Sequence, residues 1–164
     1  MSETSDIQKS LHVRYLKFQE EAEVPSSLAS RLSSPLLIAA TDAWSASKFR
    51  ILIVGQEVLG WAFASGSYYE WPFNPVANFH DFKTNHDAVE SLVQGYRVFD
   101  YAKYQPENSG GPFWSTYRKL RAGLEENIEG SILFTNLFRM SIDGGSVLKA
   151  SRDDSVTVQK APTH

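Results

Sequence analysis

Two short and almost wholly apolar segments dominate the hydrophobic pattern of the chain. FRILIVG at 49–55 is apolar and rich in β-branched residues, and SILFTNLFRM at 131–140 has a similar character. Apolar runs of this length predict buried strands. The first run hardly alternates between apolar and polar positions, which is typical of a central parallel strand covered on both faces. We therefore expect residues 49–55 to lie in the middle of a sheet.

Apolar residues at three- and four-residue spacing predict three helices. The first spans 6–23 with Ser5 or Asp6 as its N-cap, the second runs from Thr84 or Asn85 to about Tyr101, and the third spans 113–127 after the GGP break at 110–112. A strand, two helices and a second strand form a right-handed crossover unit, which favours a parallel sheet and an α/β fold.

The remaining segments are less regular. Residues 24–35 are rich in Ser and Pro and are expected on the surface, whereas LLIAA at 36–40 is either a short strand or a buried connector. The aromatic-rich segment 61–82 predicts an irregular but ordered loop, and IDGGS at 142–146 predicts a turn. We expect one domain over 1–145, with 1–34 as its N-terminal helix and surface segment. Whether the polar tail 146–164 folds is left open.

Composition narrows the class of protein. The chain has 164 residues, of which 42% are hydrophobic, and this suits one globular domain. It has no cysteine, which excludes disulfides, thiolate metal sites and cysteine nucleophiles. The formal net charge is −3, whereas nucleic-acid-binding domains usually carry an excess of basic residues. No segment is apolar enough to cross a membrane, so we expect a cytoplasmic protein.

Polar residues stand where the two predicted strands end. Gly55, Gln56 and Glu57 close the first strand, and Thr135 and Asn136 lie in the second. Because ligands of parallel α/β sheets bind at the carboxyl ends of the strands, these residues predict a binding site. Amides can hydrogen-bond a polar ring and a carboxylate can activate water. The alternatives are a simple turn at Gly-Gln-Glu and an amide that bonds a neighbouring loop.

These motifs, together with GGPFWSTYRKL at 110–120, resemble the uracil-DNA glycosylase superfamily over residues 35–145. The resemblance implies a three-layer α/β/α fold with a short, mostly parallel sheet, single-stranded or damaged DNA as partner, and no cofactor or metal. It implies that Glu57 activates water, that the Gln56 backbone holds the flipped base and that Asn136 bonds the uracil edge. Gly55 belongs to the same loop, and the candidate stacking rings, for which core packing is the alternative, are Phe113, Trp61, Trp114 and Phe63.

Several features depart from the family pattern. Val58 and Leu59 stand where the family loop carries polar groups, and Glu57 replaces an aspartate. The family's His-Pro-Ser motif has no counterpart, and only two of its four strands are evident, so we expect the C-terminal part of the fold to be missing. These departures favour base recognition without full catalysis. The alternative is a non-catalytic module that uses segment 61–82 to bind a partner or small ligand.

Two charged clusters have ordinary explanations. His80, Asp81, His86 and Asp87 include metal-ligand types, but their pattern favours loop and helix-cap chemistry, and we expect no metal. A basic cluster of Arg118, Lys119 and Arg121 lies on the predicted third helix. It suits either phosphate contacts or a solvated helix face.

Overall fold

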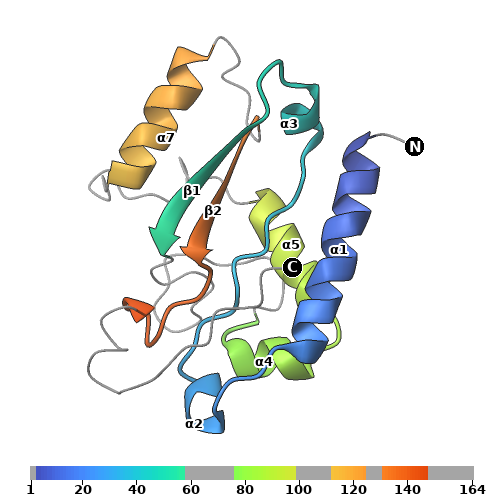
Figure 1. Cartoon of the computed structure of the whole chain (residues 1–164), viewed down its shortest axis with the longest axis vertical. Helices are drawn as coiled ribbons and strands as arrows, with labels where there is room; N and C mark the ends of the chain where they lie inside the picture. Colours follow the sequence, from blue (N-terminus) through green and yellow to red (C-terminus); the bar gives the residue numbers. More distant parts are fainter. Residues whose placement is uncertain (1–2, 58–75, 99–111, 125–130, 148–164) are drawn as a thin grey trace.

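The computed structural model describes residues 3–57, 76–98, 112–124 and 131–147, and Figure 1 shows how their elements are arranged. The helices are α1 (Glu3–Glu21), α2 (Ser26–Ala29), α3 (Asp42–Ala46), α4 (Phe79–Thr84), α5 (Ala88–Val98) and α7 (Pro112–Gly123); the strands are β1 (Ile51–Glu57) and β2 (Ile132–Phe138). Helices and a parallel pair of strands make this an α/β arrangement. None of the described helices is both long and apolar enough to span a membrane.

β1 and β2 form a two-stranded parallel sheet, which confirms the predicted parallel pairing of the two strands. Ile51 pairs with Ile132, and the register continues to Glu57 opposite Phe138. Along each strand, side chains point alternately to the two faces of the sheet. Two directly paired residues are in the same phase of this alternation, so their side chains lie on the same face. α7 lies on the β1 side of the sheet, while α1 and α5 lie on the β2 side (Figure 1).

The expectation that β1 lies mid-sheet and is covered on both faces is wrong for the described residues. Leu52 and Val54, which share one face of β1, are 43% and 51% exposed. Ile51 and Ile53, on the other face, are half-buried and pack against the core. An apolar, β-branched run predicts a strand correctly, but its composition does not say whether another element covers each face.

The three predicted helices are present with shifted ends, and the predicted ends of the second and third, about Tyr101 and 127, lie outside the described residues. α1 begins at Glu3 and ends two residues before the predicted limit, and α5 begins at Ala88 rather than at 84 or 85. Asn85 still acts as a cap, since its side chain accepts a hydrogen bond from the Asp87 N–H at 2.9 Å. α7 begins at Pro112, which suits a first turn whose N–H groups have no helical partner.

Parts of two segments that were expected to be a loop and a surface stretch instead form helices and contribute to the core; residues 61–75 lie outside the described residues. The end of segment 61–82 forms α4, because the Asn78 side chain accepts a hydrogen bond from Asp81 N–H and caps a new helix. Phe79 and Phe82 of this helix are buried. Segment 24–35 contains α2, and its second half is buried from Leu32 onward. The apolar residues of this segment are therefore drawn into the core, although its serines and prolines predicted a place on the surface.

LLIAA at 36–40 is a buried connector rather than a strand. Leu36 is buried, and its N–H donates to the carbonyl of Arg139 at 2.8 Å. The Tyr15 hydroxyl of α1 donates to the carbonyl of Ile38 at 2.9 Å, and the Gln8 side chain accepts from the N–H of Ala40. Three backbone groups of the connector are therefore hydrogen-bonded without forming a strand pair, as buried backbone requires.

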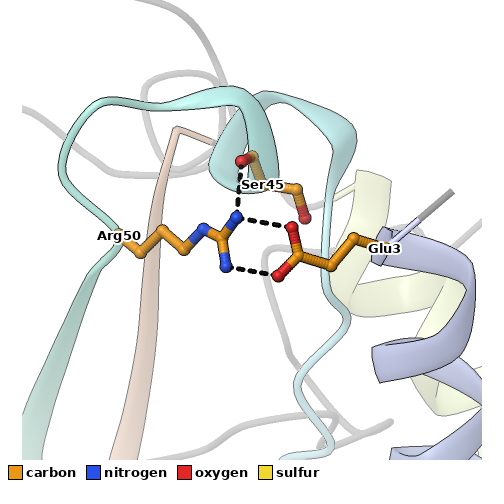
Figure 2. Close-up of polar contacts among 3 residues, drawn as sticks. All are labelled: Glu3, Ser45 and Arg50. Carbon is orange, nitrogen blue, oxygen red and sulfur yellow. Dashed lines mark hydrogen bonds and ion pairs between the residues drawn. The ribbon is translucent and has the colours of Figure 1, made fainter.

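Arg50 fastens the start of β1 to the first turn of α1 (Figure 2). Its guanidinium donates to both carboxylate oxygens of Glu3 at 2.6 Å and to the carbonyl of Ser45 at 3.3 Å. The Arg50 guanidinium lowers the pKa of the Glu3 carboxyl through these hydrogen bonds and its charge. Because both side chains are exposed, this contact orients the elements more than it stabilises them.

The turn after β2 is confirmed at 142–145. Asp143 and Gly144 both have positive φ, 50° and 74°, and the Gly145 N–H donates to the Ile142 carbonyl at 2.7 Å. Asp-Gly is the dipeptide that such a turn favours. Val147 beyond it is buried in the core, so the packed part of the chain reaches at least this residue, while 148–164 lie outside the described residues.

Candidate functional site

The polar ends of the two strands lie side by side. Gly55 of β1 is paired directly with Asn136 of β2, so the Asn136 side chain projects on the face where Gly55 has no side chain. The first turn of α7 covers the same face. In Figure 1 the arrowheads of both strands point toward this end of the sheet. The carboxyl ends of two parallel strands and the beginning of a helix therefore converge, as in the ligand sites of α/β proteins.

Phe113 and Asn136 occupy the space above Gly55. A Cβ atom placed on Gly55 would lie 2.9 and 3.0 Å from Cδ2 and Cε2 of Phe113, and it would overlap Oδ1 of Asn136. Only glycine permits so close an approach of a ring and an amide to the strand. Three residues predicted for the site, Gly55, Asn136 and Phe113, are thus in contact.

The Asn136 amide is available to a ligand. Its side chain is half-buried, and it makes no hydrogen bond to any residue in the described part of the chain. The alternative prediction, that Asn136 bonds a neighbouring loop, finds no support among these residues. A half-buried amide with a free donor and a free acceptor can bind a polar ring that presents both groups.

An aromatic cluster supports the Phe113 ring. Trp114 meets Phe113 edge to face, with ring centroids 4.9 Å apart and planes at 84°. Trp114 also contacts Tyr117 and Phe134 with centroids 5.6 and 5.1 Å away. Phe134 lies under α7 and also stacks on Tyr96 of α5 at 4.9 Å. The rings join the site to the core, so the core packing that was the alternative for Phe113 and Trp114 holds for both.

Gln56 and Thr135 do not join this group. Strand alternation places their side chains on the face opposite Asn136, where Gln56 is exposed. Thr135 is 5% exposed, and its hydroxyl is buried without a hydrogen-bond partner in the structure as described. The amides of Gln56 and Asn136 therefore cannot bind one ring together. The role suggested for Gln56 through its backbone is compatible with its place beside Gly55.

Several predicted site residues, or their side chains, lie outside the part of the chain that the structure describes. Glu57 ends β1 with its backbone paired to Phe138, but its side chain lies outside the described part. Trp61 and Phe63, together with Val58 and Leu59, also lie outside the described residues. The side chain of the predicted carboxylate and two of the four candidate stacking rings are therefore not placed.

The two charged clusters differ in position. His86 and Asp87 contact each other at 3.3 Å on the surface, and Asp81 accepts a hydrogen bond from the Ala77 N–H. Among the described residues no three His, Asp or Glu side chains are grouped to hold a metal ion. Lys119 is exposed on α7, the helix that carries Phe113. Six residues of helical rise separate the two by about 9 Å along the axis.

The structure adds two residues that the sequence did not single out for a polar role. The Tyr96 hydroxyl donates to the Phe134 carbonyl and accepts from the Phe134 N–H, both at 2.9 Å. The Tyr117 hydroxyl donates to the Ile132 carbonyl at 3.3 Å. Burial raises the pKa of Tyr96 well above its ordinary value. Both tyrosines occupy the apolar stripes of their helices, and the stripe gives no signal for the hydroxyl contacts.

Comparisons with known proteins leave the family of this chain open. No family model, curated protein or solved structure matches it.

Proposed function

We propose that the site at the carboxyl ends of β1 and β2 binds a nucleobase, in the manner of a uracil-DNA glycosylase. The observation that carries the proposal is the meeting of the Asn136 amide and the Phe113 ring over Gly55. A flipped base needs a flat apolar surface on which to stack and a polar group that bonds its edge. These two side chains supply both, and Gly55 leaves the room for them.

The proposal gives each residue a distinct task. The Asn136 amide donates to a carbonyl oxygen of the base and accepts from its ring N–H, as uracil presents them. The Phe113 ring supplies the stacking surface, since base stacking on an aromatic side chain is worth about 1–3 kcal/mol. Gln56 contributes its backbone at the adjacent position of β1. Trp61 is proposed as a further ring in contact with the substrate.

Hydrolysis is the second half of the proposal, and it rests on Glu57. A carboxylate two residues beyond Gly55 can accept a proton from the water that attacks the sugar carbon. The N-glycosidic bond breaks, and the base leaves with the bonding electron pair and takes up a proton from solvent. The partner is then single-stranded or damaged DNA, and no cofactor is needed. Lys119 on α7 supports this partner, because an exposed cation on the helix that carries Phe113 can contact a phosphate.

Binding and cleavage of a uracil-containing single-stranded oligonucleotide test the proposal together. We expect Asn136→Asp to weaken binding about tenfold or more, because a carboxylate cannot donate to the base. Thr135→Val is the matched control, since its hydroxyl is buried on the opposite face. Glu57→Gln is expected to retain binding and to abolish release of the base.

Each arm of this experiment has an outcome that contradicts the proposal. Wild-type protein that shows no preference for the uracil oligonucleotide over the matching thymine oligonucleotide removes base recognition. Equal binding by Asn136→Asp and Thr135→Val removes the role of Asn136. Cleavage by Glu57→Gln at the wild-type rate contradicts the proposed role of Glu57 in accepting a proton from water.

A non-catalytic interaction module is the second candidate function. It is favoured by the open face of β1, where Leu52 and Val54 are exposed beside Leu137, which is 73% exposed. The surface first suggested for it, 61–82, lies mostly outside the described residues, and Phe79 and Phe82 are buried in the core. Partner binding that survives Asn136→Asp and is lost in Val54→Lys would favour this second function.

A further inference from the structure

We infer that Trp114 is a positioning residue, which holds the Phe113 ring in the orientation that presents it, beside Asn136, to a planar ligand. The inference rests on the proposed function for the identity of the ligand, but its first step concerns the free protein. Trp114 is next to Phe113 in α7, and the two rings meet edge to face at 84° with centroids 4.9 Å apart. This geometry is the preferred one for an aromatic pair.

The surroundings of Phe113 explain why it needs this support. The ring belongs to the second residue of α7, where the helix begins and its backbone is least constrained. The other described ring in contact with it is Phe134, whose centroid is farther away at 6.4 Å. On the side of the strand, Gly55 offers only backbone and Asn136 is itself without a hydrogen bond in the described part.

Trp114 is held more firmly than the ring it supports. It contacts Phe134 at 5.1 Å and Tyr117 at 5.6 Å, and both of these residues are buried. Trp114 and Phe113 are both half-buried and pack against the core, so the difference between them lies in the number of contacts with described rings, three for Trp114 and two for Phe113. The indole is therefore fixed to the core on one side and faces Phe113 on the other. Its loss is expected to free the Phe113 ring without removing it.

Tyr117 provides a matched control within the same cluster. It contacts Trp114 and Phe134, and Phe113 is not among its ring partners. Tyr117→Leu removes the two ring contacts of a buried residue and the hydroxyl contact with Ile132, so it also reduces packing in this cluster. A loss of general stability therefore affects both variants, whereas a loss of Phe113 orientation affects only Trp114→Leu.

The first measurement is ¹⁹F NMR of the full chain with 4-fluorophenylalanine at position 113. The indole edge-to-face contact shifts the resonance of a neighbouring ring, so we expect this signal to move and broaden in Trp114→Leu and to stay in place in Tyr117→Leu. Trp114→Phe, which keeps an aromatic neighbour, is expected to restore a sharp signal. An unchanged signal in Trp114→Leu, or an equal change in Tyr117→Leu, overturns the inference.

The second measurement is affinity for the uracil-containing single-stranded oligonucleotide. We expect Trp114→Leu to weaken binding about five- to tenfold, Trp114→Phe to recover most of the loss, and Tyr117→Leu to change affinity less than about twofold. Equal losses in Trp114→Leu and Tyr117→Leu would assign Trp114 a structural role only. If wild-type protein does not bind the oligonucleotide, the proposed function fails, while the ¹⁹F signal still decides whether Trp114 positions Phe113. Should Trp114→Leu not fold, Trp114→Phe and Trp114→Met carry the same comparison.

Discussion

Gly55 has a hydrogen atom in place of a side chain, and the Asn136 side chain and the Phe113 ring extend into the space that this leaves. The requirement is one of room, since the surrounding atoms, rather than the backbone conformation, exclude a larger residue. A methyl group at this position would push on the first turn of α7 and on the neighbouring strand together. The geometry of the candidate site and the packing of α7 on the sheet are therefore linked through one residue.

Gly55→Ala is expected to destabilise the fold by about 1–3 kcal/mol, because overpacking a fitted contact forces its neighbours to shift. Gly123→Ala is the control, since a Cβ at Gly123 meets nothing within 4 Å and alanine favours a helix. Urea denaturation of both variants checks the prediction. A Gly55→Ala protein as stable as Gly123→Ala would show that Phe113 and Asn136 move aside without cost.

Tyr15 links protonation to stability on the alkaline side. Burial raises the pKa of its hydroxyl from 10.0 to about 12. The folded protein therefore holds this proton more tightly than the unfolded chain does. The resulting stability is present in full below pH 10 and is lost as the pH rises toward 12.

We expect the free energy of unfolding to fall between pH 10 and pH 12, with a slope of up to about 1.4 kcal/mol per pH unit from this one group. Tyr15→Phe is expected to be less stable at pH 8, because the hydrogen bond to Ile38 is lost, and to show a shallower slope. Denaturant titrations at pH 8, 10 and 11 give both values. Parallel slopes for the two proteins would contradict the link to Tyr15, and Tyr96 contributes the remaining slope in the same direction.

Among the elements, β2 is held along its backbone by two helices. The Tyr96 hydroxyl of α5 satisfies both the N–H and the carbonyl of Phe134, and the Tyr117 hydroxyl of α7 satisfies the carbonyl of Ile132. These contacts use backbone groups that a further strand would otherwise pair with. The tyrosines thus take the place of a neighbouring strand along β2.

Tyr96→Phe is expected to cost about 1–3 kcal/mol of unfolding free energy, because it removes both hydrogen bonds between the Tyr96 hydroxyl and the buried Phe134 backbone. Tyr117→Phe is expected to cost less, since it removes one longer contact of 3.3 Å. Thermal or urea denaturation ranks the two variants. The reverse order would indicate that the Tyr96 hydroxyl is replaced by water in the variant.

The elements also show what the sequence could predict. Periodic apolar residues located α1, α5, α7 and both strands, and the glycine at the end of β1 with the asparagine of β2 predicted a site that the parallel register brings together. Which faces of β1 are covered by other elements could not be predicted, because Leu and Val occur on exposed faces as well as on buried ones. α4 was missed since its start depends on a cap at Asn78, within a segment dominated by aromatic residues.

At the scale of the whole molecule, the two faces of the sheet are unequal. One face is covered by α7, and over β1 the other presents Leu52 and Val54, with Leu137 at the end of β2, to solvent. Exposed apolar side chains grouped on one face of a sheet promote contact with other molecules. The described part of the chain therefore carries a region prone to association, on the face opposite Asn136.

Val54→Lys is expected to raise the solubility limit and to lower binding of the dye ANS, while changing the unfolding free energy by less than about 1 kcal/mol. Ile53→Lys, one residue away, is expected to destabilise the protein strongly, because Ile53 packs against the core. Light scattering and ANS fluorescence test the first variant and urea denaturation tests both. Similar destabilisation by the two substitutions would mean that the face of Val54 is covered in solution.

The pairing of β1 with β2 also has a consequence for the rate of folding. Ile51 and Ile132 are 81 positions apart (132 minus 51), and the pairs that follow are as distant in sequence. The entropy of closing so long a loop must be overcome before any hydrogen bond between the strands forms. The helices, whose contacts are local, can form early, whereas the strand ends that bring Gly55 to Asn136 assemble late. The candidate site is therefore expected to be completed only in the last, slowest step of folding.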